Sequence, residues 1–316
     1  MMSTIEAGPG PADLRHDAPG SPAIVARGLT KRFRAVTAVD DLSFEVRPGR
    51  VTGFLGPNGA GKSTTLRMLL ALVKPTSGTA TVLGLPYASL AQPTLAVGAV
   101  LEVQSFHPLR TGRNHLRVLA AAAGLPDARV AEVLDQVGLT DAADRKAGGY
   151  SLGMRQRLGL AGALLGDPQV LILDEPANGL DPQGIRWLRE FLQWFAGRGN
   201  AVLVSSHLLS EMALMADDVI VIDHGRLIRQ GTVAELTAGG SHLRVASPDH
   251  DALGRALIVA GLEPRADDEG GYLLESADPE RIGRIALQAG VALSRLSIEE
   301  TSLEDAFLEM TEGIGR

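Results

Sequence analysis

A glycine-rich loop with one lysine and two hydroxyls carries the clearest chemical signal in this sequence. It matches the spacing G-x-x-x-x-G-K-S, which is typical of loops that bind the phosphates of a nucleoside triphosphate. The loop consists of Gly56, Pro57, Asn58, Gly59, Ala60, Gly61, Lys62, Ser63 and Thr64. An apolar run at 50–55 precedes it and a helical pattern follows from Thr65, so the motif lies in the strand–loop–helix setting that it requires.

The residue types of this phosphate loop fit a polyphosphate and a magnesium ion. Gly59 and Gly61 allow the backbone to turn its N–H groups toward an anion, and the positive end of the following helix points at the same place. Lys62 is long enough to reach the terminal phosphates. The Ser63 hydroxyl is an oxygen ligand of the kind that magnesium prefers. We therefore expect a magnesium nucleoside triphosphate at this loop.

Two acidic residues follow a second buried strand. Residues 170–173 are apolar, and Asp174 and Glu175 come directly after them. Open α/β sheets bind their ligands at the carboxyl ends of the strands. Asp174 is therefore a candidate to hold magnesium, and Glu175 a candidate to orient or deprotonate an attacking water. The alternative is a strand that simply leaves the core through polar residues, and the phosphate loop upstream argues against it.

Three further residues are ambiguous from their chemistry alone. His207 ends a buried strand and could contact a terminal phosphate, although a lone histidine is usually structural or exposed. Ser151 is placed as the N-cap of a helix, which is an ordinary structural role, but a helix start can also bind an anion. Phe33 lies between the first two expected strands, at 23–29 and 39–46. Its ring could stack on an adenine, or belong to the core or its rim.

Composition excludes several classes of protein. The 316 residues carry a net charge of −7 without a basic stripe, which makes nucleic acid improbable as the main partner. The absence of cysteine excludes thiolate metal sites and disulfides. No apolar run approaches the roughly 20 residues that cross a bilayer, and residues 1–20 lack the apolar core of a signal peptide. We expect a cytoplasmic protein that would need a separate spanning partner for any membrane role.

The order of patterns predicts two domains after a tail. Residues 1–22 are rich in proline and glycine and predict a disordered tail. An α/β domain is expected over 23–238, with an all-helical insert at about 111–166. A Gly-Gly-Ser sequence at 239–241 then marks a boundary. The order β-α-β-β-α-β-α over 241–316 favours a small α+β domain of ferredoxin-like type, which we interpret as accessory or dimer-stabilising.

Over residues 23–238 the chain resembles the ATP-binding-cassette (ABC) ATPases, because five motifs occur in the order typical of that family. They are the phosphate loop at Gly56–Ser63, a signature variant at Ser151-Leu152-Gly153-Met154, the acidic pair Asp174-Glu175, a D-loop at Gly179-Leu180-Asp181 and a switch histidine at Ser206-His207. Phe33 falls where the family places its adenine-stacking aromatic, which favours that role over a core position. The resemblance implies a P-loop NTPase fold of ABC type, with a mixed sheet core and a helical insert.

The likeness extends to a subtype. Residues 97–116, the run Y-S-L-G-M-R-Q-R-L and residues 301–307 look like the ATPase subunits of bacterial exporters of the daunorubicin- and bacitracin-resistance type. Such subunits pair with a separate integral-membrane permease. The resemblance thus implies an ATP-hydrolysing subunit that attaches peripherally to the inner face of the cell membrane and powers export.

The resemblance also implies how the site works. Two copies would face each other head to tail, with ATP and Mg²⁺ between the phosphate loop of one and the turn at Ser151 of the other. Glu175 would position the water, His207 would bridge to the γ-phosphate, and Asp181 would link the two sites. The loop and helix at 105–116 would pass the motion to the permease.

The sequence departs from the family pattern at two places. The family usually has glutamine at the end of the strand before the insert, where the best alignment here puts Glu102, with Gln104 two residues on. A carboxylate can still approach magnesium, so Glu102 is a further candidate metal ligand, although when ionised it cannot donate a hydrogen bond to water. In the signature, Leu152 replaces a glycine, while Ser151 and Gly153 remain as candidate nucleotide contacts.

Three alternatives stay open. An importer ATPase belongs to the same class. A soluble ABC protein acting on ribosomes or DNA is disfavoured, because ribosome-type members resemble two cassettes in one chain and DNA-repair members carry a coiled coil in the insert. An interaction module with a dead site is opposed by the intact Lys62, Asp174 and Glu175.

Overall fold

The computed structural model describes residues 21–101, 106–237, 241–267, 270–275, 278–300, 303, 304 and 307. The expectations for Glu102, Gln104 and the boundary residues Gly239 and Gly240 therefore fall outside the described residues, as do almost all of the tail at 1–22 and part of 301–307. No helix in the described part of the chain is both long and apolar enough to cross a bilayer.

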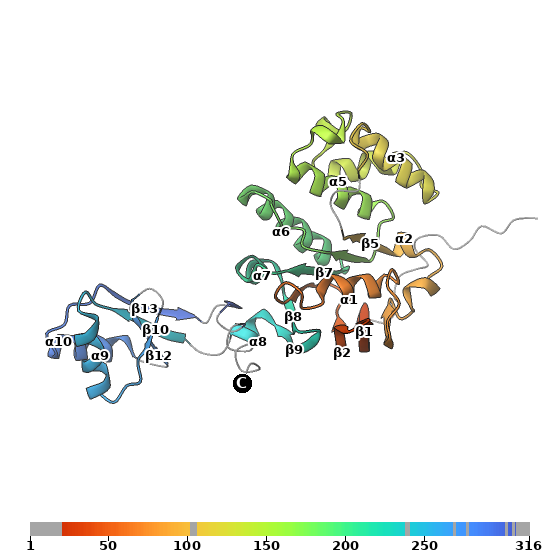
Figure 1. Cartoon of the computed structure of the whole chain (residues 1–316). Helices are drawn as coiled ribbons and strands as arrows, with labels where there is room; N and C mark the ends of the chain where they lie inside the picture. The colour runs from red at the N-terminus through yellow and green to blue at the C-terminus, as the bar shows by residue number, and fades with distance from the viewer. Residues whose placement is uncertain are drawn as a thin grey trace, which may run out of the picture. The chain divides into compact units, whose positions relative to one another are not determined.

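The chain divides into two compact units, the first ending at Gly231 and the second starting at Thr232 (Figure 1). The sequence placed the boundary at 238, after the short helix α8 (Val233–Thr237), whereas the contacts of the chain group α8 with the second unit. The Thr232 amide donates to Glu235 Oε2 at 2.8 Å, and the Glu235 amide donates to Thr232 Oγ1 at 3.0 Å. This reciprocal cap starts α8 directly at the division.

A six-stranded sheet forms the core of the first unit, with the strand order β5-β6-β7-β3-β8-β9. Its strands are β3 (Val51–Leu55), β5 (Val97–Val100), β6 (Val170–Leu173), β7 (Ala201–Ser206), β8 (Asp218–Asp223) and β9 (Arg226–Thr232). The first five strands in this order are parallel. Most of their residues are buried, as expected for parallel strands covered by helices on both faces.

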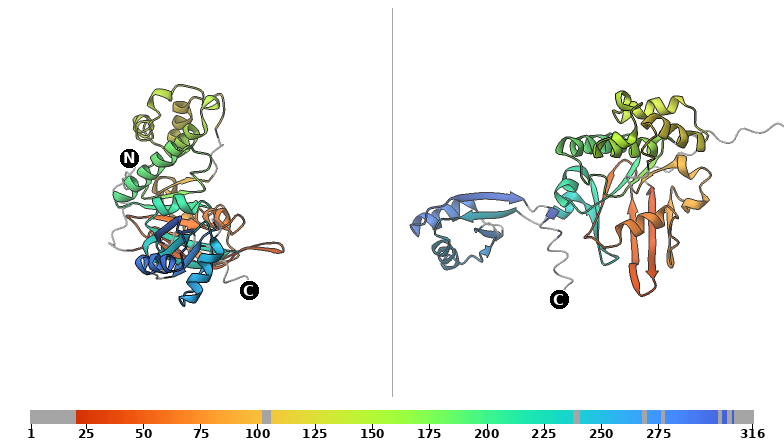
Figure 2. Two further views of the ribbon diagram at one scale, coloured as in Figure 1. Left: turned by 90° about the vertical axis from the view of Figure 1, so that its left-hand side faces the viewer. Right: turned by 45° about the horizontal axis from the view of Figure 1, so that its top comes forward.

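A second, three-stranded sheet has the order β2-β1-β4 and is antiparallel. It consists of β1 (Ile24–Phe33), β2 (Val36–Val46) and β4 (Ser77–Val82). β1 and β2 form the long hairpin visible in Figure 2. The two sheets share one apolar core, in which Phe44 and Phe54 lie 5.4 Å apart between ring centroids and Leu66 and Leu69 of helix α1 (Lys62–Leu69) are buried.

Three helices make up the insert between β5 and β6, and Figure 1 shows them gathered at one end of the unit. They are α3 (Gly112–Ala122), α4 (Ala128–Gln136) and α5 (Leu152–Leu164). Thr111 caps α3, because its hydroxyl accepts from the Asn114 amide at 3.2 Å. The remaining helices of the unit are α2 (Pro93–Ala96), α6 (Pro182–Gly197) and α7 (Leu209–Met215), with short 3₁₀ turns at Tyr87–Ser89, Thr140–Ala142 and Ala147–Gly149.

The second unit contains a four-stranded antiparallel sheet in the order β11-β12-β10-β13. Its elements after α8 are β10 (Ser241–Ala246), α9 (His250–Val259), β11 (Arg265–Ala266), β12 (Tyr272–Glu275), α10 (Pro279–Gln288) and β13 (Arg295–Glu300). Both helices contribute to one core, through Leu253 and Leu257 of α9 and Ile282 of α10. This is the ferredoxin-like arrangement that the sequence predicts.

Candidate nucleotide-binding and hydrolysis site

The phosphate loop joins β3 to α1 in a conformation that requires its glycines. Gly59 and Gly61 have φ values of 87° and 99°, in the left-handed region that disfavours other residues. A Cβ on Gly61 would also collide with the carbonyl oxygen of Ala38. Hydrogen bonds from the Ala60 amide to Pro57 O (3.1 Å) and from the Gly225 amide to Ala60 O (3.0 Å) hold the loop in this shape.

Lys62 turns back over the loop, although it is the first residue of α1. Its Nζ donates to Gly56 O at 2.6 Å and to Pro57 O at 3.3 Å, and only 7% of its side chain is exposed. A buried ammonium requires such partners. The ammonium is thus held at the centre of the loop, where a polyphosphate would meet it.

The start of α1 is suited to an anion. Its N-cap, Gly61, offers no side-chain acceptor, and no acidic residue lies in the first turn. The first backbone N–H groups of the helix therefore stay available. Ser63 and Thr64 are half-buried, whereas Thr65 is fully buried and donates its hydroxyl hydrogen to Gly61 O at 3.0 Å.

The acidic pair at the end of β6 is fixed by a serine of the neighbouring strand β7. Ser205 Oγ donates to Asp174 Oδ1 at 2.5 Å and accepts from the Glu175 amide at 2.9 Å. Glu175 itself has a φ of 49°, which is unusual for a residue other than glycine. The two carboxylates are therefore directed by a specific hydrogen bond and by an uncommon backbone turn.

Three predicted catalytic side chains meet at the carboxyl ends of adjacent strands. Glu175 Oε2 lies 2.8 Å from His207 Nδ1, and Glu175 Oε1 lies 3.4 Å from Lys62 Nζ. The strand order β6-β7-β3 explains this, because Glu175 follows β6, His207 follows β7 and the phosphate loop follows β3. Parallel strands end at one edge of the sheet, so residues far apart in the sequence are brought together there.

Ser151 and Asp181 lie outside this cluster and cap helices. Ser151 Oγ accepts from the Met154 amide at 3.3 Å at the start of α5, and Asp181 Oδ1 accepts from the Gly184 amide at 2.9 Å at the start of α6. Within the described ranges, no hydrogen bond or ion pair links either residue to the phosphate loop. Both are exposed, and Gly153 lies two residues after Ser151, in the first turn of α5.

Phe33 is the last residue of β1, and not a residue between two strands as the sequence suggested. β1 runs further than expected because its polar end, with Lys31 and Arg32, still pairs with β2. The Phe33 ring is 48% exposed, and Lys31 Nζ lies 4.8 Å from its centroid. The ring is therefore at the rim of the fold and not in the core.

Sequence reasoning missed Ser205, which orients both acids. A serine at the end of a buried strand was the only signal, and it does not specify the partner. Metal binding is limited by the donors that are present: within the described part of the chain, no group of three or more His, Asp or Glu side chains could hold a metal ion. Ser63 and Asp174 offer hard oxygen ligands, so magnesium fits here when phosphate oxygens and water complete its shell.

Comparison with known proteins agrees with this geometry. A family model described as ABC transporter matches residues 39–178, which include the phosphate loop, the Ser151 turn and the acidic pair. The uncharacterized ABC transporter ATP-binding protein YhcH of Bacillus subtilis is 40% identical over 90% of this chain and 94% of its own length. The chain belongs to the ABC transporter family of ATP-binding proteins.

Two other relatives confirm the resemblance that the motifs suggested. The bacitracin transport ATP-binding protein BcrA of Bacillus licheniformis is 34% identical to this ABC ATPase. The match covers 90% of this chain and 96% of BcrA. The daunorubicin/doxorubicin resistance ATP-binding protein DrrA of Streptomyces peucetius is 36% identical, covering 92% of both chains. The protein is thus an ATPase subunit whose cassette binds and hydrolyses ATP.

A solved structure supports the fold of this ABC ATPase. The structure of the ATP-binding subunit of an ABC transporter superposes with a TM-score of 0.62 at 28% identity, over 68% of this chain and 92% of that one. Residues 241–304 of the second unit match a family described as a domain of unknown function, DUF8746.

Proposed function

We propose that this ABC ATPase powers export of a drug, antibiotic or lipid-like molecule through a separate membrane permease, from the cytoplasmic face of the cell membrane. Two of its full-length relatives are a bacitracin transport protein and a daunorubicin resistance protein, which supports this proposal over an importer, ribosomal or DNA role. The observation that carries the ATPase part is the contact of Glu175 with both Lys62 and His207 beside the phosphate loop.

In the proposed reaction, the γ-phosphate of ATP displaces Glu175 from Lys62. Glu175 then orients or deprotonates the attacking water, and His207 contacts the γ-phosphate. Ser63 and Asp174, with Glu102 as a further candidate, would hold magnesium, which neutralises charge on the phosphates. The Ser205 hydroxyl keeps Asp174 in place throughout.

The proposed active form is a head-to-tail homodimer. Ser151 and Asp181 are exposed and lie apart from the phosphate loop of their own chain, so a second copy is required to bring them to the nucleotide. Ser151 and Gly153 would then contact the γ-phosphate of the partner's ATP. Asp181 would connect the two sites, and the exposed ring of Phe33 would stack on adenine.

The permease is proposed to dock where the helical insert meets β5, next to the expected coupling segment 105–116. An apolar cavity of about 410 Å³ lies there, and residues such as Ala99, His115, Leu119 and Leu158 line it. Leu109, in the adjoining loop, is 68% exposed. Apolar surface of this kind supports a protein partner and not nucleic acid.

Isolation from membranes tests the transport role. The tagged full-length chain, captured from detergent-solubilised membranes of its host, should retain a multi-span protein. Leu119→Asp in the cavity wall should lose that partner but keep nucleotide binding, and Leu72→Asp, at an exposed leucine elsewhere, should keep both. Recovery of the chain with ribosomes or DNA, or with no membrane protein, would contradict the proposal.

A further inference from the structure

The helices α5 and α6 begin at the two turns that carry Ser151 and Asp181, and these turns touch each other. Leu152 packs so closely on Gly179 that a Cβ on Gly179 would collide with the Leu152 side chain. Gly153 faces Leu180, because a Cβ placed on Gly153 would be in van der Waals contact with it. The position of one turn therefore depends on the position of the other.

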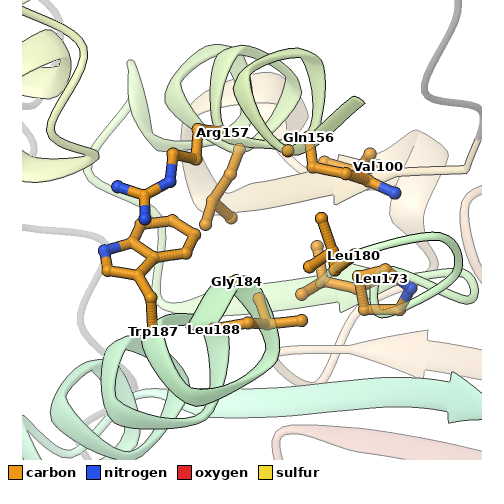
Figure 3. Close-up of a pocket in the computed structure, with 11 residues that line it drawn as sticks. Val100, Gln156, Arg157, Leu173, Leu180, Gly184, Trp187 and Leu188 are labelled. Atoms are coloured by element: carbon orange, nitrogen blue, oxygen red, sulfur yellow. The ribbon is translucent and has the colours of Figure 1, made fainter. Parts of the chain in front are cut away.

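A stacked pair connects the two helices almost two turns further along. The guanidinium carbon of Arg157 lies 3.9 Å from the ring centroid of Trp187 (Figure 3). Arg157 comes six residues after Ser151 on α5, and Trp187 comes six residues after Asp181 on α6. A stacked guanidinium is a directional contact, since it requires the plane of the ring as well as its distance.

Arg157 and Trp187 each make one further contact that fixes their position. Arg157 Nη1 donates to Val137 O at 3.0 Å, at the end of α4. Trp187 stacks on Phe191 with 5.6 Å between ring centroids. Burial lowers the pKa of Arg157, and the negative charge of Asp181 partly opposes this effect.

Packing between the helices leaves a small gap at one place. A cavity of about 20 Å³ lies beside the stack, and Figure 3 shows Leu180, Gly184 and Leu188 on its α6 side and Gln156 on its α5 side. Protein interiors normally leave few such gaps. The Arg157–Trp187 stack is therefore one of the contacts that set the distance between the helices, together with Leu152 against Gly179 and Leu180 beside Gly153.

We propose that Arg157 and Trp187 are positioning residues, which hold the Ser151 turn and the Asp181 turn at a fixed separation so that a second copy's nucleotide meets both together. The inference rests on the proposed head-to-tail dimer. Neither residue touches the nucleotide itself. Loss of the stack should leave the phosphate loop intact but present a poorly ordered surface to the partner.

The test uses the full-length chain and a matched pair of tryptophans. Trp187→Leu keeps apolar volume and removes the aromatic face, and Trp187→Phe keeps a face. Trp194→Leu is the control, because Arg198 lies 5.1 Å from the Trp194 centroid at the far end of the same helix. For Trp187→Leu we expect kcat to fall about 5- to 30-fold, the range of a partly desolvated cation–π contact, with ATP binding to the single chain within about two-fold of wild type.

The same change should weaken the ATP-dependent dimer. In a Glu175→Gln background, the dimer dissociation constant measured in ATP should rise by a similar factor for Trp187→Leu, recover for Trp187→Phe and stay unchanged for Trp194→Leu. A purely structural contact would instead lower the melting temperature and reduce ATP binding and kcat together, and that result would overturn the proposal.

Two further variants, Arg157→Lys and Ser151→Ala, also test the positioning role. Arg157→Lys retains the charge but loses the planar face, and it should reproduce Trp187→Leu even if the latter fails to fold. Wild-type turnover in Arg157→Lys would overturn the positioning role. Ser151→Ala distinguishes the proposed dimer from the proposed positioning role. If Ser151→Ala slows turnover while Arg157→Lys does not, the dimer is supported and the positioning role of Arg157 and Trp187 is wrong. If Ser151→Ala has no effect, the proposed dimer contact itself is wrong.

Discussion

Glu175 forms an ion pair with Lys62 in this structure, with 3.4 Å between the Glu175 Oε1 and the Lys62 Nζ. The residue expected to activate water and the residue expected to bind phosphate are thus each other's partners. Lys62 is buried and Glu175 is partly buried, and in the proposed reaction a nucleotide must separate the two before hydrolysis begins. Part of the binding free energy of ATP is therefore spent on exchanging one anion for another at Lys62.

Glu175→Gln should separate binding from hydrolysis. The amide cannot serve as a base, so we expect turnover to fall by roughly 10²- to 10⁴-fold. ATP affinity should be equal to wild type or higher, because the neutral side chain no longer competes for Lys62. Single-turnover phosphate release and equilibrium nucleotide binding measure the two effects. The variant should also accumulate as a dimer in ATP, and near-normal turnover would reject the role of Glu175.

Lys62→Ala should lose nucleotide affinity. The substitution removes the charge-assisted hydrogen bonds to phosphate and leaves Glu175 without its cation, and bonds of this kind correspond to about 10- to 100-fold in affinity. Titration with a fluorescent ATP analogue gives the dissociation constant. Unchanged binding would show that the phosphates are held elsewhere.

Ser205→Ala tests the role of Ser205, which the sequence alone did not identify as a site residue. Asp174 loses a donor and the Glu175 amide loses its acceptor, so the free energy of unfolding should fall by about 1–3 kcal/mol. Turnover should decrease, and the magnesium concentration needed for half-maximal rate should rise. Ser205→Thr restores a hydroxyl and should recover much of both. Equal activity in Ser205→Ala and wild type would remove Ser205 from the site.

His115 should make the fold sensitive to mild acid. Its Nδ1 is buried without a hydrogen-bond partner among the described residues, and burial, assisted by the charge of Arg110, lowers the pKa of its imidazole below the usual value of about 6.5. As pH falls below 6.5, the unfolded chain takes up a proton that the folded chain resists, so stability is lost in this window. Denaturant unfolding at pH 7.5 and 5.5 should show a smaller loss for His115→Leu than for wild type. The same loss in both would contradict this.

The strongest predictions from sequence were those in which residue type, spacing and setting agreed. Lys62, Asp174 and Glu175 belong to short motifs at the ends of apolar strands, and the parallel sheet necessarily brings such ends together. Phe33 was misplaced because β1 continues past its apolar part: pairing with β2, through local shifts in register, extends the strand into polar residues. The hydrophobic pattern of a strand ends where its residues stop being buried, whereas its hydrogen-bonded pairing with a neighbouring strand can continue further.

Contacts between distant side chains were beyond the reach of sequence reasoning. Arg157 and Trp187 are 30 positions apart, and neither belongs to a pattern that specifies the other. The same holds for Ser205 and Asp174, which meet only because β6 and β7 are neighbours in the sheet. The reciprocal cap formed by Thr232 and Glu235 is a local signal in the sequence for the start of α8 at the division between the units.

The left-handed turn at Glu175 decides which inactive variants are informative. Glutamine has nearly the same shape as glutamate and leaves the left-handed backbone at position 175 unchanged, so its effect reports on charge, basicity and hydrogen bonding and not on the backbone. Glycine would relax the peptide and free the chain after β6 at the same time as it removed the carboxylate. A β-branched side chain would add steric conflict to the chemical loss.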